Sequence, residues 1–385
     1  MKFVCEGVKI MKIKGKKIPY IVIYIFIIIL VVLIKFLFLD IRSPDYNVFL
    51  SKWFDKIIEL GNIDALKHTI GDYPDSYMFI LVLGTYITRN SLLYIKIVSI
   101  IFDFIIFIFG YKIIKKFDKD LAIKKSWILL IIPGIIVNSA VLGQCDSIFS
   151  AFILIFIYYI LKGKNKLALL FLGISFSFKL QALFVAPILI YLLYTKKIKM
   201  LDVIFILIGF IIPFIPSIVY GKGLIENIKI LLFQTSEYNK FVEACPNIYS
   251  LVYLNYIEIN VILKYILSLI VIIISVIICL TKISRTYSNQ VFLKKLVMLS
   301  LIVPLLLPSM HDRYFYLANI LIIIYFIIEN KNRNTSYLLI ILSSIIYVLP
   351  VISINFLKDL YIDYIVTSLI CSPINLYIVY KMLNE

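Results

Sequence analysis

The chain has 385 residues, of which 62% are hydrophobic and 16% are charged. With a mean hydropathy of +1.02, this composition excludes an ordinary soluble domain, in which about half of the residues are apolar. The net charge of +17 does not indicate a nucleic-acid-binding protein, because the basic residues lie in short segments between long apolar runs. We therefore expect an all-α polytopic membrane protein with no nucleic-acid partner.

The first apolar run covers residues 19–39 and follows a basic stretch, 1–18, that contains six lysines. The run is long enough to cross ~30 Å of hydrocarbon. No small-residue cleavage site follows it, so we interpret it as a retained first span and not as a signal peptide. Residues 1–18 are then a basic cytoplasmic N-terminus, and 19–381 form a single transmembrane domain.

Basic clusters recur at seven places along the chain, the last of them at Lys381. Placing all seven in the cytoplasm, as the positive-inside rule requires, orients the chain in the plasma membrane with both termini inside. About twelve transmembrane helices follow from this placement. They lie near 19–39, 91–113, 126–142, 147–161, 166–180, 182–194, 201–219, 258–280, 291–308, 314–329, 336–353 and 361–380.

Two large external loops, 40–90 and 220–257, separate these spans. Within them, the amphipathic stretches 48–60 and 224–233 are typical of helices that lie along a membrane surface. The apolar segment 76–87 has only twelve residues, too few for an unassisted crossing. We expect a re-entrant or interfacial helix there, and the sequence leaves open whether residues 76–88 span or re-enter.

The polar clusters of the chain fall on the external side in this topology, which favours a shared site. Asp45 follows the first span in the sequence Ser-Pro-Asp-Tyr, and Pro44 makes its turn stiff. A carboxylate in this position is suited to act as a general base toward a hydroxyl group. The alternative is that Asp45 only caps a following helix, and Asp40 is a rival base.

Gln144 and Asp146 lie in a tight external turn after Gly143. They supply an amide and a carboxylate to the site, although Asp146 is equally suited to be the N-cap of the next helix. Asp45 and Asp146 together also offer oxygen ligands for a divalent metal ion, but their spacing does not require one. Lys179, followed by Gln181, supplies a cation for a phosphate, or else a lysine that extends toward the interface from a helix end.

Three ionisable residues in succession, His311, Asp312 and Arg313, form the sharpest cluster. Arginine binds phosphate in a bidentate manner, and histidine donates a hydrogen bond or transfers a proton. The cluster precedes Tyr314 and follows Pro308, so the alternative is a solvated turn with an aromatic anchor at the interface.

Other polar residues allow two interpretations each. Asn247 is suited either to contact a sugar ring or to stabilise a turn. Cys145 and Cys245 both fall on the external side, where they form a disulfide or serve as small apolar fillers. We expect Lys96 and Asp103, inside a span, to bond to neighbouring helices and to lie outside the site.

At these residues the chain resembles the GT-C class of polytopic glycosyltransferases, which take sugars from polyprenyl phosphate. It is most similar to bacterial integral membrane proteins related to the GPI-anchor mannosyltransferases. The resemblance covers about residues 20–330 and rests on five short motifs that occur in order. These are Ser-Pro-Asp45-Tyr46, Tyr73-Pro74, Gly-Gln144-Cys-Asp146, Lys179-Leu-Gln181 and Met-His311-Asp312-Arg313-Tyr314.

The resemblance implies an inverting transfer in which Asp45 is the catalytic carboxylate. Lys179, His311 and Arg313 would then bind the phosphate of the donor. The rest of the pocket would consist of Tyr46, Tyr73, Gln144, Asp146, Gln181, Asn247, Asp312 and Tyr314. The chain departs from the family pattern at Cys145, at the absence of a tryptophan near Gly143, and at Asp312, where glutamate is commoner, and these departures leave the sugar undetermined.

The sequence thus predicts a glycosyltransferase that moves mannose or a similar hexose from a polyprenyl-phosphate donor to a glycan, lipid or protein of the cell envelope. A lipid-linked oligosaccharide flippase or another transporter is the first alternative. A transporter should place its polar groups near the bilayer midplane, whereas here they gather at one face. A polymerase of envelope polysaccharide shares the same substrates and is the second alternative.

Overall fold

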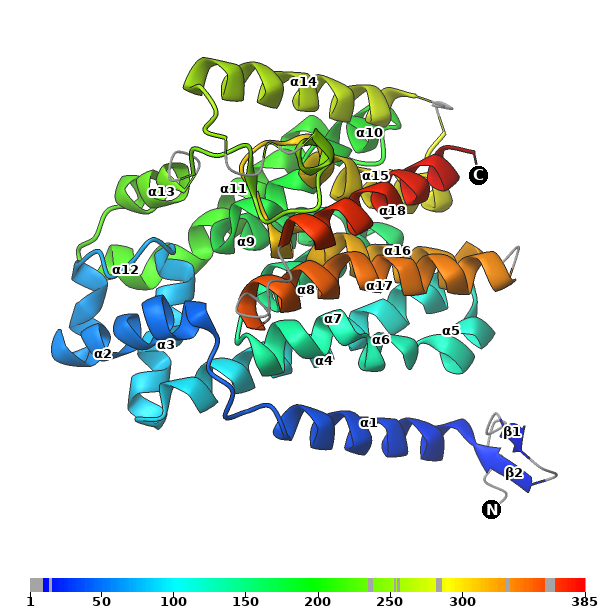
Figure 1. The fold of residues 1–385 in the computed structure, drawn as a ribbon, viewed down its shortest axis with the longest axis horizontal. Helices are drawn as coiled ribbons and strands as arrows, with labels where there is room; N and C mark the ends of the chain where they lie inside the picture. The colour runs from blue at the N-terminus through cyan, green and yellow to red at the C-terminus, as the bar shows by residue number, and fades with distance from the viewer. Residues whose placement is uncertain are drawn as a thin grey trace.

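A computed structural model describes residues 10–13, 16–234, 238–252, 254, 257–281, 286–329, 333–356 and 364–384. Most of the predicted basic N-terminus, residues 1–9, 14 and 15, lies outside them. The described part of the chain is a bundle of helices, as Figure 1 shows. The expectation of an all-α membrane protein is confirmed.

Each of the twelve predicted spans coincides with helical structure. Several of these helices are continuous: α1 (Tyr20–Phe36), α4 (Ser91–Phe117), α8 (Asp146–Leu161), α9 (Asn165–Phe178), α14 (Val261–Leu280), α15 (Asn289–Leu306), α16 (Tyr316–Glu329), α17 (Arg333–Phe356) and α18 (Tyr364–Asn384). Within the described residues, five helical segments are long and apolar enough to cross a membrane: Ser91–Phe117, Met200–Val219, Val261–Leu280, Asn289–Leu306 and Asn334–Phe356. The number of spans therefore stays a prediction.

The other predicted spans are built from short pieces. One consists of α6 (Ile128–Ile131), α7 (Pro133–Ile136) and the π-helix η3 (Val137–Val141), and a second of η4 (Leu180–Val185) and α10 (Ile188–Tyr194). A third consists of η5 (Met200–Val203), α11 (Ile204–Ile211), η6 (Ile212–Phe214) and α12 (Ile215–Val219). Pro133, Pro187, Pro213 and Pro216 lie at or near these breaks, as expected for a residue without a backbone N–H.

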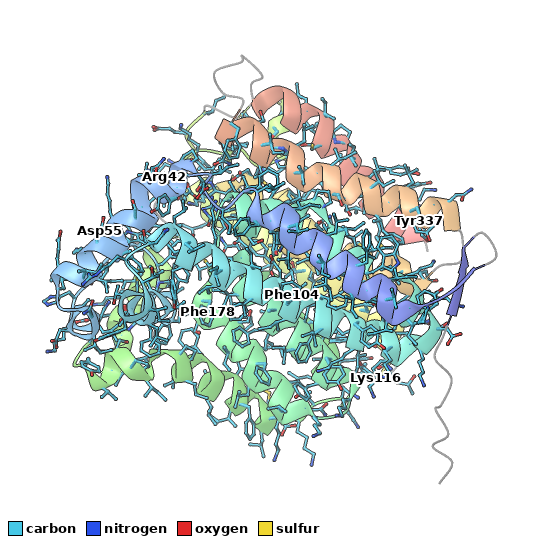
Figure 2. The ribbon with its side chains drawn as sticks, turned by 90° about the horizontal axis from the view of Figure 1, so that it is seen from below. Arg42, Asp55, Phe104, Lys116, Phe178 and Tyr337 are labelled. Atoms are coloured by element: carbon cyan, nitrogen blue, oxygen red, sulfur yellow. The ribbon has the colours of Figure 1, made fainter. Side chains whose placement is uncertain are left out.

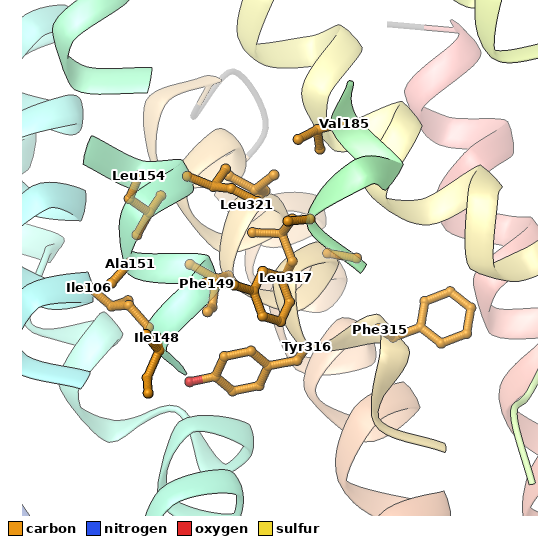
Figure 3. Packing of buried hydrophobic residues seen from close by; sticks show 14 of the residues in the cluster. Ile106, Ile148, Phe149, Ala151, Leu154, Val185, Phe315, Tyr316, Leu317 and Leu321 are labelled. Atoms are coloured by element: carbon orange, nitrogen blue, oxygen red, sulfur yellow. The ribbon is translucent and has the colours of Figure 1, made fainter. Parts of the chain in front are cut away.

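Helices α8 and α16 form the centre of the bundle, and nearly all of their side chains are buried. Figure 3 shows Phe149 of α8 beside Leu317 of α16. Helices α9 and α11 approach through Gly209, where an added Cβ would lie 1.9 Å from the carbonyl oxygen of Leu170. Small residues allow such close helix contacts in membranes. Helices α1 and α14 instead expose large apolar faces.

The two large loops carry helices of their own. The first contains η1 (Tyr46–Leu50), α2 (Ser51–Glu59), η2 (Asn62–Lys67) and α3 (Asp75–Ile87), and the second contains α13 (Leu224–Phe233) and η7 (Ile248–Val252). A helix is thus present at the predicted segment 76–87. A buried ion pair of 2.9 Å between the Lys222 ammonium and the Asp75 carboxylate joins the two loops, which lie together at one end of the bundle (Figure 1).

Two short strand pairs were not expected from the sequence. The antiparallel pair β1 (Ile10–Ile13) and β2 (Lys16–Pro19) precedes α1. The parallel pair β3 (Val242–Glu243) and β4 (Met310–His311) attaches the second large loop to the segment before α16. This second pair is important for the site because it fixes the backbone at His311.

Two ionisable residues inside a predicted span, Asp103 and Lys96, have structural partners. Asp103 forms a buried ion pair with Lys35 of α1, which confirms that it bonds to a neighbouring helix. Lys96 donates hydrogen bonds to the carbonyl oxygens of Phe38 and Ile41 at 2.7 and 2.6 Å. Both carbonyl groups lie between the end of α1 and Asp45. Lys96 therefore helps to fix the backbone that leads to Asp45.

Candidate functional site

A cavity of about 560 Å³ opens at the loop end of the bundle. Nine of the twelve residues predicted for the site line it, and they come from segments far apart in the sequence. The nine are Asp45, Tyr73, Gln144, Lys179, Gln181, His311, Asp312, Arg313 and Tyr314. The structure therefore brings the five motifs together around one space.

Asp45 enters the cavity from the turn after the first span. The hydroxyl group of Ser43 donates to the carbonyl oxygen of Leu142 at 2.9 Å and accepts from the backbone N–H of Tyr46 at 3.2 Å. Ser43 therefore supplies the capping bond at the start of η1, whereas Asp45 makes no such bond. The alternative that Asp45 only caps a helix is not supported, and its carboxylate is directed to other partners.

Two donors converge on one oxygen of Asp45. The amide nitrogen of Gln144 donates to Oδ2 at 2.7 Å, and a terminal nitrogen of Arg313 donates to the same oxygen at 2.9 Å. No residue in the described parts of the chain donates to Oδ1. The carboxylate is thus oriented through one oxygen, and the other oxygen is left to interact with a bound group.

Lys179 and Asp146 form a buried pair at the back of the cavity. The ammonium lies 2.5 Å from Oδ1 of Asp146, and both side chains are less than 5% exposed. The other oxygen of Asp146 accepts from the amide of Asn138 at 2.9 Å. Lys179 lies 5.4 Å from the centre of the Tyr73 ring. A lysine held in this way does not extend to the interface, and Asp146, at the first residue of α8, acts as its counter-ion and not as an N-cap.

The segment of β4 and η8 (Asp312–Phe315) carries the cluster predicted to bind phosphate. The ring of His311 packs edge-on against Tyr238, with centres 4.4 Å apart. Burial, together with the nearby cations Arg313 and Lys179, lowers the pKa of His311 well below its ordinary value. His311 is therefore neutral at neutral pH and contributes a hydrogen bond but no charge.

The carboxyl group of Asp312, a ring nitrogen of His311 and a guanidinium nitrogen of Arg313 complete this side of the cavity. Burial raises the pKa of Asp312 to about 6. Nε2 of His311 and Nε of Arg313 are buried and have no hydrogen-bond partner among the described residues. Because buried polar atoms are normally satisfied by protein, water or ligand, these nitrogens are suited to a polar ligand in the cavity.

Three predicted residues do not line the cavity. The hydroxyl group of Tyr46 bonds to Ser91 at 2.8 Å, and Asp146 lies behind Lys179. Asn247 is fully buried, and its side-chain oxygen accepts from the backbone N–H groups of Tyr249 and Ser250. For Asn247 the turn interpretation replaces the predicted contact with a sugar, because its hydrogen-bonding groups are used within the loop.

The structure adds lining residues that the sequence did not indicate. Trp53 of α2, Asp72, Gln234, Tyr238 and Asn355 all face the cavity. Gln234 also donates to the carbonyl oxygen of Asp72 at 2.6 Å. For Trp53, Asp72, Gln234 and Tyr238 the only signal was their position in the two large loops, which does not separate them from their neighbours. Asn355 lies at the end of α17 and had no such signal.

The described residues contain neither a disulfide nor a cluster of side chains suited to a metal ion. Cys145 and Cys245 are both buried free thiols, which agrees with the interpretation as apolar fillers. The described part of the chain contains no group of three or more His, Cys, Asp or Glu side chains arranged to hold a metal ion. Asp146, one of the two carboxylates considered as metal ligands, is engaged by Lys179.

Comparison with known proteins adds one finding. Residues 72–220 match the family model described as dolichyl-phosphate-mannose-protein mannosyltransferase. The match supports a GT-C-like membrane glycosyltransferase. It includes three of the five motifs, those at Tyr73, Gln144 and Lys179, and ends before the second large loop. No curated protein matches the chain.

Proposed function

We propose that this protein transfers a mannosyl or similar hexosyl group from a polyprenyl-phosphate donor to a hydroxyl group of a cell-envelope acceptor. The observation that carries this proposal is the meeting of Asp45 with Arg313 and Lys179 in one cavity. A carboxylate and two cations at that position match the needs of a sugar transfer from phosphate. The mannosyltransferase family match over 72–220 supports the choice of sugar.

Arg313 and Lys179 are the residues for the donor phosphate in this proposal. The guanidinium group uses one terminal nitrogen for Asp45 and keeps further N–H groups for an anion, which it binds with directional hydrogen bonds. Lys179 adds a point charge from the back of the cavity. His311, being neutral, donates a hydrogen bond. Positioning and charge neutralisation are then the main contributions of the protein.

Asp45 is the general base of the proposed reaction. The acceptor oxygen attacks the anomeric carbon, the bond from that carbon to the phosphate oxygen breaks, and the hydroxyl proton passes to Asp45. Polyprenyl phosphate leaves with the electron pair, so no protein nucleophile is needed, and a single displacement inverts the anomeric configuration. Gln144 and Arg313 hold Oδ2, so the proton goes to Oδ1.

An apolar pocket of about 400 Å³ adjoins the cavity and supports a lipid-linked donor. The two spaces share Gln181, Gln234, Tyr238 and Tyr314. The walls of the pocket come mainly from η4, α14 and the segment 307–310 that follows α15, and α14 exposes a large apolar face. A prenyl chain placed here would extend from the phosphate toward the lipid, whereas a nucleotide would bring a second phosphate and a polar base into an apolar space.

The proposal is tested with purified protein in lipid nanodiscs. Polyprenyl-phosphate mannose, polyprenyl-phosphate glucose and a nucleotide sugar are offered in separate reactions, and the release of polyprenyl phosphate is followed. We expect release from a polyprenyl-phosphate sugar and none from the nucleotide sugar. A flippase or transporter would move the lipid-linked sugar across the bilayer without releasing polyprenyl phosphate, and that result would overturn the proposal.

The role of Asp45 is tested by Asp45→Asn, which keeps the shape of the side chain and its bond to a donor. Loss of a general base should lower kcat by about 10²- to 10⁴-fold without lowering the amount of protein in the membrane. Asp40→Asn is the matched control, because Asp40 is exposed and does not line the cavity. An active Asp45→Asn variant would remove Asp45 from the catalytic role.

A further inference from the structure

A second and larger groove lies away from the cavity just described. It has a volume of about 940 Å³ and runs between α1 and α4, with α5 (Lys119–Lys125) at one end. Its walls are mostly apolar or aromatic, with Tyr20 and Tyr24 on α1 facing Phe107 and Tyr111 on α4. Figure 2 shows α1 along the side of the bundle, with Lys116 near the end of α1 that joins β2.

The groove exists because α1 is fastened to the bundle at separate points. The hydroxyl group of Tyr24 bonds to Ser126 at 2.6 Å, and eleven residues further along α1 Lys35 pairs with Asp103. Most other side chains of α1 are apolar and exposed. A membrane helix that contacts its neighbours only at intervals leaves room for lipid chains between the contacts.

Four lysines gather at one end of the groove: Lys112, Lys115, Lys116 and Lys119. No carboxylate lines the groove, and none of the four forms an ion pair with a residue that the structure describes. Lys112 lies over the ring of Phe109 at 4.4 Å. The groove therefore combines an apolar trough with a cluster of positive charge and no carboxylate in its lining.

This end of the groove is remote from the proposed active site. Ser91, at the start of α4, bonds to Tyr46, the residue after Asp45. Lys115 lies 24 residues further along the same continuous helix, a rise of about 36 Å. A ligand at the lysines therefore does not reach the cavity that holds Asp45.

We propose that the α1–α4 groove binds an anionic phospholipid from the leaflet at the lysine end, which the charge distribution predicts to be the cytoplasmic one. The acyl chains lie along the trough, and the phosphate lies among the lysines, which attract anionic headgroups at the membrane surface. The hydroxyl groups of Tyr20 and Tyr111, which also line the groove, add hydrogen bonds to the headgroup. A second copy of this chain is a poorer occupant, because a protein with a net charge of +17 repels itself at a basic groove.

The proposal is tested by native mass spectrometry of the detergent-purified protein with added phosphatidylglycerol or phosphatidylcholine. We expect phosphatidylglycerol to be retained and phosphatidylcholine to dissociate. The variant K115Q/K116Q/K119Q should weaken phosphatidylglycerol binding at least ten-fold, since each lysine near the surface contributes roughly a five-fold factor. The control K164Q/K166Q/K196Q removes three exposed lysines that do not line the groove and should leave binding unchanged.

A second variant tests the trough without changing the charge. Ile108 is 43% exposed in the wall of the groove, so Ile108→Trp fills the space for an acyl chain while the lysines stay in place. It should also weaken phosphatidylglycerol binding. Equal retention of the two lipids, or equal loss in the groove and control variants, would overturn the proposal. A dimer that Ile108→Trp dissociates would overturn it in favour of self-association.

Discussion

Lys179 has two proposed roles: it binds the donor phosphate, and its buried pair with Asp146 stabilises the fold. Variants of this pair separate the two roles. Both side chains are nearly inaccessible, and the charged atoms lie 2.5 Å apart. Asp146→Asn alone leaves the lysine buried without a counter-ion. Removing one partner of a buried pair costs about 3–5 kcal/mol, so this variant should melt at a markedly lower temperature in detergent.

The double variant Lys179→Met with Asp146→Asn removes both charges and should regain most of the lost stability, because no buried charge is left unpaired. The amide of Asn138 still finds an acceptor at position 146. Activity should not return. A lost hydrogen bond to a charged group is worth about 1.5–3 kcal/mol, so kcat/KM for the polyprenyl-phosphate donor should fall roughly ten- to 150-fold.

The pair formed by Lys35 and Asp103 is the matched control. It is also buried, with both side chains below 5% exposure, but it joins α1 to α4 and does not line the cavity. The double variant Lys35→Met with Asp103→Asn should be stable and active. If the variant at Lys179 and Asp146 is equally stable and keeps its affinity for the donor, Lys179 does not bind the phosphate.

Three further predictions concern stability, each measured as the melting temperature in detergent. Because burial raises the pKa of Asp312 to about 6 from the ordinary 3.8, the folded state binds this proton more tightly than the unfolded state. The stability that this group contributes is present below about pH 4 and is lost as the pH rises through 6. Asp312→Asn should therefore be more stable than the natural protein at pH 7.5, by up to about 3 kcal/mol, and the difference should shrink toward pH 4; a constant difference would contradict this. Gly209→Ala places a methyl group 1.9 Å from the carbonyl oxygen of Leu170 and should separate two helices at a cost of more than about 1 kcal/mol, and an unchanged melting temperature would show that the helices adjust. Lys222→Met leaves Asp75 buried without its cation and should cost about 3–5 kcal/mol, which a second change, Asp75→Asn, should largely restore.

Several properties of the site were predictable from local sequence. A proline next to Asp45, a glycine next to Gln144 and three ionisable residues from His311 are conspicuous in a chain this apolar, because polar groups near a bilayer are costly. The same cost underlies the predicted spans, because their expected lengths and flanking lysines follow from the thickness and charge of the membrane.

For other polar residues the sequence did not indicate whether they belong to the site or support the fold. Asn247 and Asp75 are as polar and as external as Asp45, yet the structure uses them to hold loops together. Lys96 supports the chain before Asp45 from another helix. Tyr238 reaches the cavity beside His311, whose backbone is fixed by a strand pair that no periodicity in the sequence indicates.

The amino-acid sequence by itself determined that the chain is a helical membrane protein and which few segments carry chemistry, since both follow from the energy of single groups in water and in lipid. Only the tertiary structure decided which groups meet. Asp45 and Arg313 are 268 positions apart and in contact, and such a contact depends on how helices pack against one another. Packing is set by the shapes of many side chains together, as at Gly209, and no local pattern encodes it.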